Sequence, residues 1–181
     1  MLYILIIVLM LILLYVLGTY NKFVKNNNKV LEAFSTMDVY LKKRWDLIPN
    51  LVETVKGYAN HESKTLEEVI KLRNSSYDKL NEGEKIDLNN QLSQGLGRLM
   101  AISEDYPELK ANENFKQLSS SLSSIENDIA NSRKYYNAVV RTFNDMVGMV
   151  PSNIIAKMFK FSAKSMFEAE VSQRENVNVK F

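Results

Sequence analysis

His61 is the side chain best suited to acid–base or metal chemistry, because the chain has one histidine and no cysteine. Glu62 follows it, as in the HExxH pattern of zinc peptidases, but Thr65 stands where that pattern needs a second histidine. A di-iron bundle site needs a Glu-x-x-His motif from each of two helices, and a serine triad needs a nucleophile motif such as G-x-S-x-G. Neither pattern occurs in the sequence. We therefore predict no catalytic, cofactor or metal site and expect that the protein is not an enzyme.

Carboxylates leave one enzymatic alternative open. Glu53, Glu62, Glu113 and Glu126 could face a common interior and form a site together with His61. Most glutamates of helical proteins instead lie on solvated faces. Stoichiometric metal bound to the protein would favour the alternative, an enzyme or enzyme subunit.

Two segments combine basic and aromatic residues, 42–45 and 133–136. Such segments can contact nucleic acid, but Trp45 also fits an apolar helical stripe. The formal net charge is only +2, far from the basic excess typical of nucleic-acid binders. We predict no nucleic-acid partner.

The first 21 residues carry no charged side chain, and the apolar run Met1–Leu17 is centred on Leu9. As a helix rising about 1.5 Å per residue, residues 1–21 would span about 31 Å, against a hydrocarbon core of about 30 Å. A secretory signal peptide would have a basic leader before a shorter apolar run. The sequence predicts a retained transmembrane anchor over residues 1–21, with the lipid bilayer as its partner.

Three lysines, Lys22, Lys25 and Lys29, follow the apolar run, and no charge precedes it. The positive-inside rule places such a flank in the cytoplasm. We expect a single-pass cell-membrane protein whose C-terminal domain is cytoplasmic.

The rest of the chain predicts helices, with residues 22–150 forming a bundle. Apolar residues recur at three- and four-residue steps before and after Pro49. Pro49 allows two interpretations: a first-turn proline of a new helix capped by Asp46, or a kink in one long helix. The sequence leaves these two interpretations open.

Further along, residues 81–83 predict the end of a helix, and Asp87 predicts the N-cap of the next one. Gly95 and Gly97 lie inside that helix and predict close helix packing. A helix of 36 residues is expected over 112–147.

Residues 151–170 predict a short helix, 153–159, followed by an aromatic and basic segment that packs on the bundle end. Ile154, Ile155, Met158 and Phe159 would dock into a groove there. The alternative is that residues 151–167 bind a lipid surface, since lysines alternate with aromatics. Residues 171–181 predict a frayed tail.

Four ordered segments resemble the LemA family: RWDLIPNLVETVKGYANHE (44–62), YPELKANENF (106–115), SRKYYN (132–137) and PSNIIAKMF (151–159). The resemblance extends over nearly the whole chain. It implies a bacterial membrane-anchored protein with an antiparallel four-helix bundle, and it favours two helices at Pro49. It implies no catalytic residues, because the family has no established biochemical activity.

The sequence thus predicts an all-α protein, with a transmembrane helix followed by a long four-helix bundle. We expect a non-enzymatic interaction or scaffold module that binds an unknown protein partner. The polar residues of the first matched segment are the candidate partner surface: Arg44, Asp46, Asn50, Lys56, His61 and Glu62. The alternative for these residues is a buried hydrogen-bond network that joins helix ends.

Overall fold

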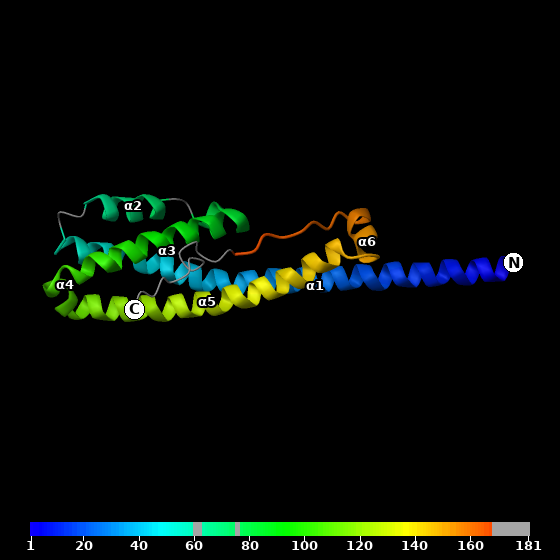
Figure 1. The fold of residues 1–181 in the computed structure, drawn as a ribbon, viewed down its shortest axis with the longest axis horizontal. Helices are drawn as coiled ribbons and strands as arrows, with labels where there is room; N and C mark the ends of the chain where they lie inside the picture. The colour runs from blue at the N-terminus through cyan, green and yellow to red at the C-terminus, as the bar shows by residue number, and fades with distance from the viewer. Residues whose placement is uncertain (60–62, 75–76, 168–181) are drawn as a thin grey trace, which may run out of the picture. The chain divides into compact units, whose positions relative to one another are not determined.

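The computed structural model describes residues 1–59, 63–74 and 77–167, and all regular structure in these ranges is helical (Figure 1). The predicted all-α class is therefore confirmed. The elements are α1 (Leu2–Lys56), α2 (Ser63–Arg73), the 3₁₀ turn η1 (Tyr77–Lys79), α3 (Glu82–Glu104), α4 (Pro107–Ala111), α5 (Glu113–Gly148) and α6 (Ser152–Met158).

Helix α1 runs for 55 residues and continues through Pro49. The expectation of two helices meeting at Pro49 is wrong, and the interpretation as one long helix is correct. Proline costs one backbone hydrogen bond inside a helix. The apolar stripe keeps its phase past it, with Ile48, Leu51 and Val55 all buried. The burial of this stripe offsets the loss at Pro49.

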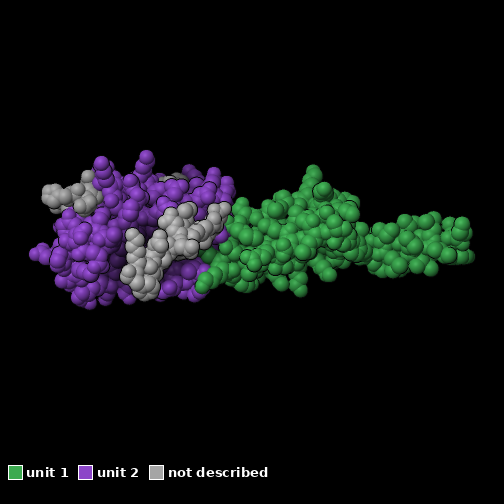
Figure 2. All heavy atoms as spheres, viewed as in Figure 1, with its two compact units in different colours: residues 1–36, 132–166 green, residues 37–131, 167–181 purple. Residues whose placement is uncertain are grey.

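The chain forms two compact units, drawn in different colours in Figure 2. Unit 1 consists of residues 1–36 and 132–166. Unit 2 contains residues 37–131. Helices α1 and α5 each contribute to both units.

In unit 2, α2 packs closely on α3 at Gly95. A Cβ atom at Gly95 would lie 3.1 Å from the Val69 side chain, so glycine permits the approach of the two helices. The prediction of close packing is confirmed at Gly95. It is wrong at Gly97, which faces open space.

Helix α3 begins earlier than the sequence predicted. Asn81 accepts a hydrogen bond from the backbone of Glu84 at 3.0 Å, and the Glu84 carboxylate accepts one from the backbone of Asn81 at 2.9 Å. This reciprocal capping box satisfies two amides at the helix start. Asn81 therefore begins a helix where we expected one to end, and Asp87 lies inside α3 instead of capping it.

Helix α5 has the predicted length of 36 residues. Five of its buried residues recur every seventh position, Phe115, Leu122, Ile129, Tyr136 and Phe143, and Val140 is buried as well. Asn112 caps the helix by accepting a hydrogen bond from the Phe115 amide at 3.0 Å. Seven residues are about two helical turns, so this spacing keeps one side of α5 in contact with its neighbours.

In unit 1, α5 runs antiparallel to α1. Phe143 pairs with Phe23 and Tyr136 pairs with Phe34, at ring distances of 6.0 and 5.8 Å. After α5 the chain turns into α6, which lies beside α1 in Figure 1, and the Phe159 ring contacts Tyr20 at 4.7 Å.

The prediction that α6 docks through its apolar residues is confirmed for Ile155, which is buried. It is wrong for Ile154 and Met158, which are exposed. Phe159 docks only in part, because its ring contacts Tyr20 but stays 42% exposed. The predictions for residues 168–181 lie outside the described residues.

Among the described residues, α1 is the one helix that is long and apolar enough to cross a membrane, and its apolar segment lies near the N-terminus. Residues 2–15 are all exposed, and the first buried residue of α1 is Thr19. In Figure 2 the green unit 1 narrows to this bare helical segment. The structure thus supplies a candidate membrane anchor.

Candidate functional site

Arg44 is the most unusual residue of the unit 2 core, because its side chain is 0% exposed. It lies in α1 at a position of a seven-residue repeat whose other members, Val30, Met37 and Leu51, are buried and apolar. A buried cation is costly unless hydrogen bonds and a counter-ion compensate the lost hydration. The surroundings of Arg44 must therefore supply both.

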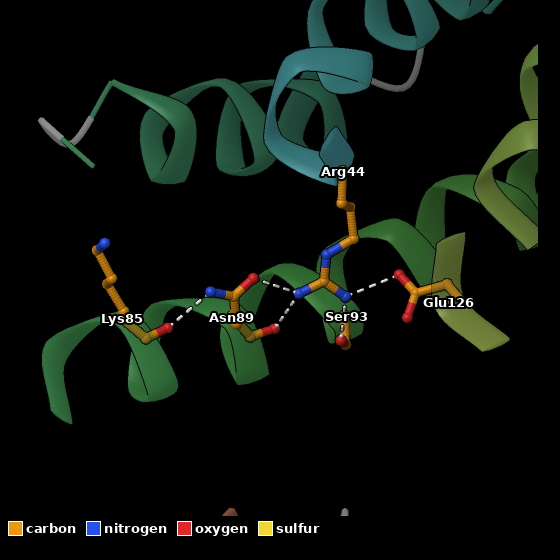
Figure 3. Close-up of polar contacts among 5 residues, drawn as sticks. All are labelled: Arg44, Lys85, Asn89, Ser93 and Glu126. Atoms are coloured by element: carbon orange, nitrogen blue, oxygen red, sulfur yellow. Dashed lines mark hydrogen bonds and ion pairs between the residues drawn. The ribbon is translucent and has the colours of Figure 1, made fainter. Parts of the chain in front are cut away.

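Helices α3 and α5 supply these partners (Figure 3). Arg44 Nη1 donates to Glu126 Oε1 at 2.7 Å and to Ser93 Oγ at 2.8 Å. Arg44 Nη2 donates to the backbone oxygen of Asn89 at 3.0 Å and to its side-chain oxygen at 2.5 Å. We call Arg44, Asn89, Ser93 and Glu126 the arginine cluster.

The arginine cluster leaves little capacity for binding a ligand. Each of the terminal nitrogens Nη1 and Nη2 donates hydrogen bonds to two acceptors. The buried Nε has no hydrogen-bond partner within the described chain. When groups of the same chain accept all the hydrogen bonds of an arginine's terminal nitrogens, the arginine serves to hold helices in position. The cluster ties the interiors of α1, α3 and α5 together.

A second polar branch adjoins the cluster through Asn89. The Asn89 amide donates to the backbone oxygen of Lys85 at 2.7 Å, and Lys85 pairs with Asp38 at 2.8 Å. Tyr77 of η1 donates to the same Asp38 carboxylate at 2.6 Å, and its ring lies 5.1 Å from that of Trp45. This branch fixes η1 against α1 and α3.

Burial raises the pKa of the Tyr77 hydroxyl above its ordinary value, and the hydrogen bond to Asp38 raises this pKa further. The folded state thus holds its proton at a pH where an unfolded tyrosine, with a pKa of about 10, has lost it. The stabilisation is complete below pH 10 and is lost as the pH rises further, by up to about 1.4 kcal/mol per pH unit.

We expect Tyr77→Phe to remove this alkaline slope while lowering the free energy of unfolding at pH 8 by about 1 kcal/mol, because one hydrogen bond is lost. Denaturant unfolding at pH 8, 10 and 11 measures both effects. Tyr135→Phe is the matched control, since Tyr135 is exposed. An unchanged alkaline slope in Tyr77→Phe would contradict the prediction.

The structure separates the six residues predicted as a partner surface. Arg44 is fully buried, so its assignment to an exposed surface is wrong, and the alternative of a buried network is correct for it. The network joins helix interiors instead of helix ends. Asp46, Asn50 and Lys56 are exposed on α1. His61 and Glu62 lie outside the described residues.

Asp46, Asn50 and Lys56 share one side of α1 with Glu53, which sequence reasoning had not placed on this surface. The steps between them are four, three and three residues, which keeps all four on one face of the helix. We call these four residues the α1 ridge. Asp46 pairs with Lys42 at 2.8 Å, and this hydrogen bond raises the pKa of Lys42. Within the described chain, the side chains of Asn50, Glu53 and Lys56 make no hydrogen bond or ion pair.

Two grooves flank the α1 ridge within unit 2. One, of about 270 Å³, has an apolar floor and is lined by Ile48, Pro49, Val52, Glu53, Lys56, Ile70, Arg73 and Asn74. The other, of about 410 Å³, is mostly polar and is lined by Asn50, Glu53, Thr54, Asn114, Gln117, Leu118 and Ser121. Glu53 borders both grooves. The ridge therefore combines polar side chains that have no partner among the described residues with an apolar groove directly beside it.

The carboxylates of the enzymatic alternative do not gather in the described part of the chain. Glu53 and Glu113 are exposed, and Glu126 is bound to Arg44. Among the described residues, no three histidine, aspartate or glutamate side chains lie close enough together to hold a metal ion.

Sequence reasoning missed Asn89 and Ser93. It correctly placed Trp45 on the buried stripe of α1 but missed the burial of Arg44. The spacing Val30, Met37, Arg44 and Leu51 was a signal for the burial of Arg44, because each step is seven residues. Asn89 lies seven residues before the buried Leu96. No comparable pattern identifies Ser93.

Protein LemA of Metamycoplasma hominis is 26% identical over 165 residues, which are 89% of this chain and 74% of that relative. Magnetosome protein MamQ 2 of Paramagnetospirillum magneticum is 36% identical over 73 residues, and MamQ of Magnetospirillum gryphiswaldense is 35% identical over 72. These two matches cover 40% of this chain but only 27% and 26% of the relatives. The LemA family model matches residues 33–181, so the chain belongs to the LemA family.

Proposed function

We propose that this LemA-family protein is a single-pass membrane-anchored module that binds another protein through the α1 ridge and its two grooves. The observation that carries the proposal is the ridge itself. Three exposed polar side chains, those of Asn50, Glu53 and Lys56, have no partner among the described residues. Glu53 and Lys56 border the apolar groove, and Asn50 borders the polar one. Protein interfaces combine such features, with an apolar centre and a polar rim.

The arginine cluster supports this proposal indirectly. It lies in the same segment of α1, where Arg44 is bound to α3 and α5. A surface held on a fixed helix loses little conformational freedom on binding, which favours affinity.

A double substitution on the ridge tests the proposal. We expect Asn50→Arg with Glu53→Arg to lower the recovery of proteins that co-purify with the full-length chain from detergent-solubilised membranes by about tenfold, since two new cations disfavour the original partner by more than about 1.4 kcal/mol. Quantitative mass spectrometry measures the recovery. Thermal unfolding should be unchanged, because both positions are exposed.

Ser124→Arg with Asn127→Arg is the matched control, since these residues are also exposed and three positions apart on one helix. It should retain every co-purifying protein. If the ridge variant retains them all as well, the ridge is not the binding surface. If it loses them only together with a lower melting temperature, the ridge acts in folding instead.

For the sidedness of the anchor, we propose that the C-terminal domain is cytoplasmic. Lys22, Lys25 and Lys29 follow the apolar run, and the segment 157–164 of unit 1 contributes three further lysines, Lys157, Lys160 and Lys164. Basic residues near the end of a span favour the cytoplasmic side.

A single engineered cysteine tests the sidedness, because the natural chain has none. Ser123 is exposed, whereas Ser119 is partly covered and lies 3.8 Å from the Met100 sulfur. We expect Ser123→Cys to react with a membrane-impermeant maleimide only after cell lysis. Labelling of intact cells would reverse the orientation.

A further inference from the structure

We infer that the corner between α5 and α6 is a second membrane contact, which inserts into the lipid interface beside the anchor and meets anionic headgroups. The α6 corner consists of Met149, Val150, Ile154, Met158 and Phe159. The inference rests on the anchor of the proposed function and is independent of the α1 ridge.

The first argument for this membrane contact is the length of the exposed N-terminal part of α1. Residues 2–15 are exposed along their whole length, but fourteen helical residues cover only about 21 Å. A hydrocarbon core of about 30 Å requires about 20 residues. The span must therefore continue to about Tyr20, which lies just past Thr19, the first buried residue of α1.

The second argument for this membrane contact is the position of α6 beside Tyr20. The Phe159 ring lies 4.7 Å from Tyr20, and Phe161 lies 6.0 Å from it. Both contacts belong to unit 1. If the hydrocarbon reaches Tyr20, then α6 lies at the edge of the hydrocarbon.

The exposed surface of the α6 corner is suited to that depth. Met149, Val150, Ile154 and Met158 are 62%, 79%, 61% and 59% exposed, respectively, and all are apolar. Exposure of this apolar surface to water is unfavourable. An interfacial helix buries such a face into the boundary between headgroups and acyl chains. Ile155, by contrast, is buried within unit 1 and holds α6 in place.

The charges around the corner favour anionic headgroups as the surrounding surface. Residues 146–167 contain three lysines and no acidic residue, and residues 1–31 contain another three lysines and no acidic residue. The whole chain has a net charge of only +2, so positive charge is concentrated in these two segments. Each lysine near an anionic surface strengthens the attraction to it.

The test uses the full-length chain in proteoliposomes and a fluorescent probe on single engineered cysteines. We expect probes at Val150→Cys and Met158→Cys to be quenched severalfold more by brominated acyl chains than a probe at Ala138→Cys. Ala138 is an exposed α5 residue about 16 Å before Met149 along the helix axis. Because α5 runs antiparallel to α1, Ala138 lies away from the span. Aqueous iodide should give the opposite order of quenching.

Equal lipid quenching at all three positions, with strong iodide quenching at Val150 and Met158, would overturn the inference. A second measurement concerns the headgroups. Adding phosphatidylglycerol to phosphatidylcholine membranes should increase lipid quenching at Val150, and Lys157→Gln with Lys160→Gln should remove that increase. Absence of the increase in the unsubstituted chain would contradict the role of anionic lipid.

An alkaline carbonate wash separates this inference from the proposed function. A chain released by the wash has no spanning anchor, and then the proposed membrane attachment itself fails. A chain that resists the wash while its corner probes stay in water retains the anchor and contradicts only the second contact.

Discussion

Replacing Arg44 with methionine is expected to lower the free energy of unfolding by about 2–3 kcal/mol, because a buried acceptor loses its donor. The Glu126 side chain is 38% exposed, so its carboxylate can be hydrated after the substitution. Methionine keeps much of the volume but donates no hydrogen bond. The side-chain oxygen of Asn89, a residue that is 1% exposed, would then lose its donor, whereas the Asn89 backbone oxygen lies within α3 and keeps its helical hydrogen bond. Each unsatisfied buried group costs about 1–3 kcal/mol. Denaturant unfolding of the full-length chain in detergent measures the difference.

Lys43→Met is the matched control, because Lys43 is the exposed neighbour of Arg44 on the same helix. It should change the free energy of unfolding by no more than about 0.5 kcal/mol. A cost for Arg44→Met below about 1 kcal/mol would mean that the arginine cluster contributes little to holding α1, α3 and α5 together.

The second large effect concerns the anchor. We expect Leu5→Arg, Leu9→Arg and Leu13→Arg, combined in one chain, to release the protein from carbonate-washed membranes into the soluble fraction. Each arginine near the middle of a span costs about 2.5–3.5 kcal/mol, so three cost roughly 8–10 kcal/mol. That sum is comparable with the whole favourable insertion of the apolar run, at about 0.3–0.6 kcal/mol per residue.

The control for the anchor places arginine at Leu31 and Val39, which are exposed apolar residues of α1 outside the predicted span. This variant should remain in the washed membranes. Retention of the triple variant as well would show that residues 1–21 do not anchor the chain.

The features predicted well are those in which one strong signal acts alone. Residues 1–21 lack charge, α5 has an uninterrupted apolar repeat, and Pro151 precedes the short helix α6. At Pro49 the sequence left two interpretations open, and the family resemblance favoured two helices, which is wrong. The burial of Ile48, Leu51 and Val55 on both sides of Pro49 stabilises one continuous helix, and a local rule for proline does not include that burial.

The arginine cluster shows a different limit. Its members come from α1, α3 and α5, and Arg44 and Glu126 are 82 positions apart in the chain. Spacing within one helix can indicate that Arg44 is buried, but it cannot indicate which carboxylate compensates it. Asn81 shows the same limit on a smaller scale, since residues 81–84 fit a capping box while Gly83 favours a helix end.

The seven-residue repeat of α5 has one further consequence. A helix whose buried residues recur every seventh position could slide by seven residues and still present apolar side chains to α1. Arg44 removes this ambiguity of register. A slide in one direction would place Ser119 where Glu126 now stands, next to Arg44, and Ser119 carries no charge. A slide in the other direction would place Arg133 there, so that two cations would meet. A single polar residue in an apolar seam selects one alignment in the same way in coiled coils. The arginine cluster thus distinguishes the native alignment from its nearest competitors, which the apolar stripe alone would not do.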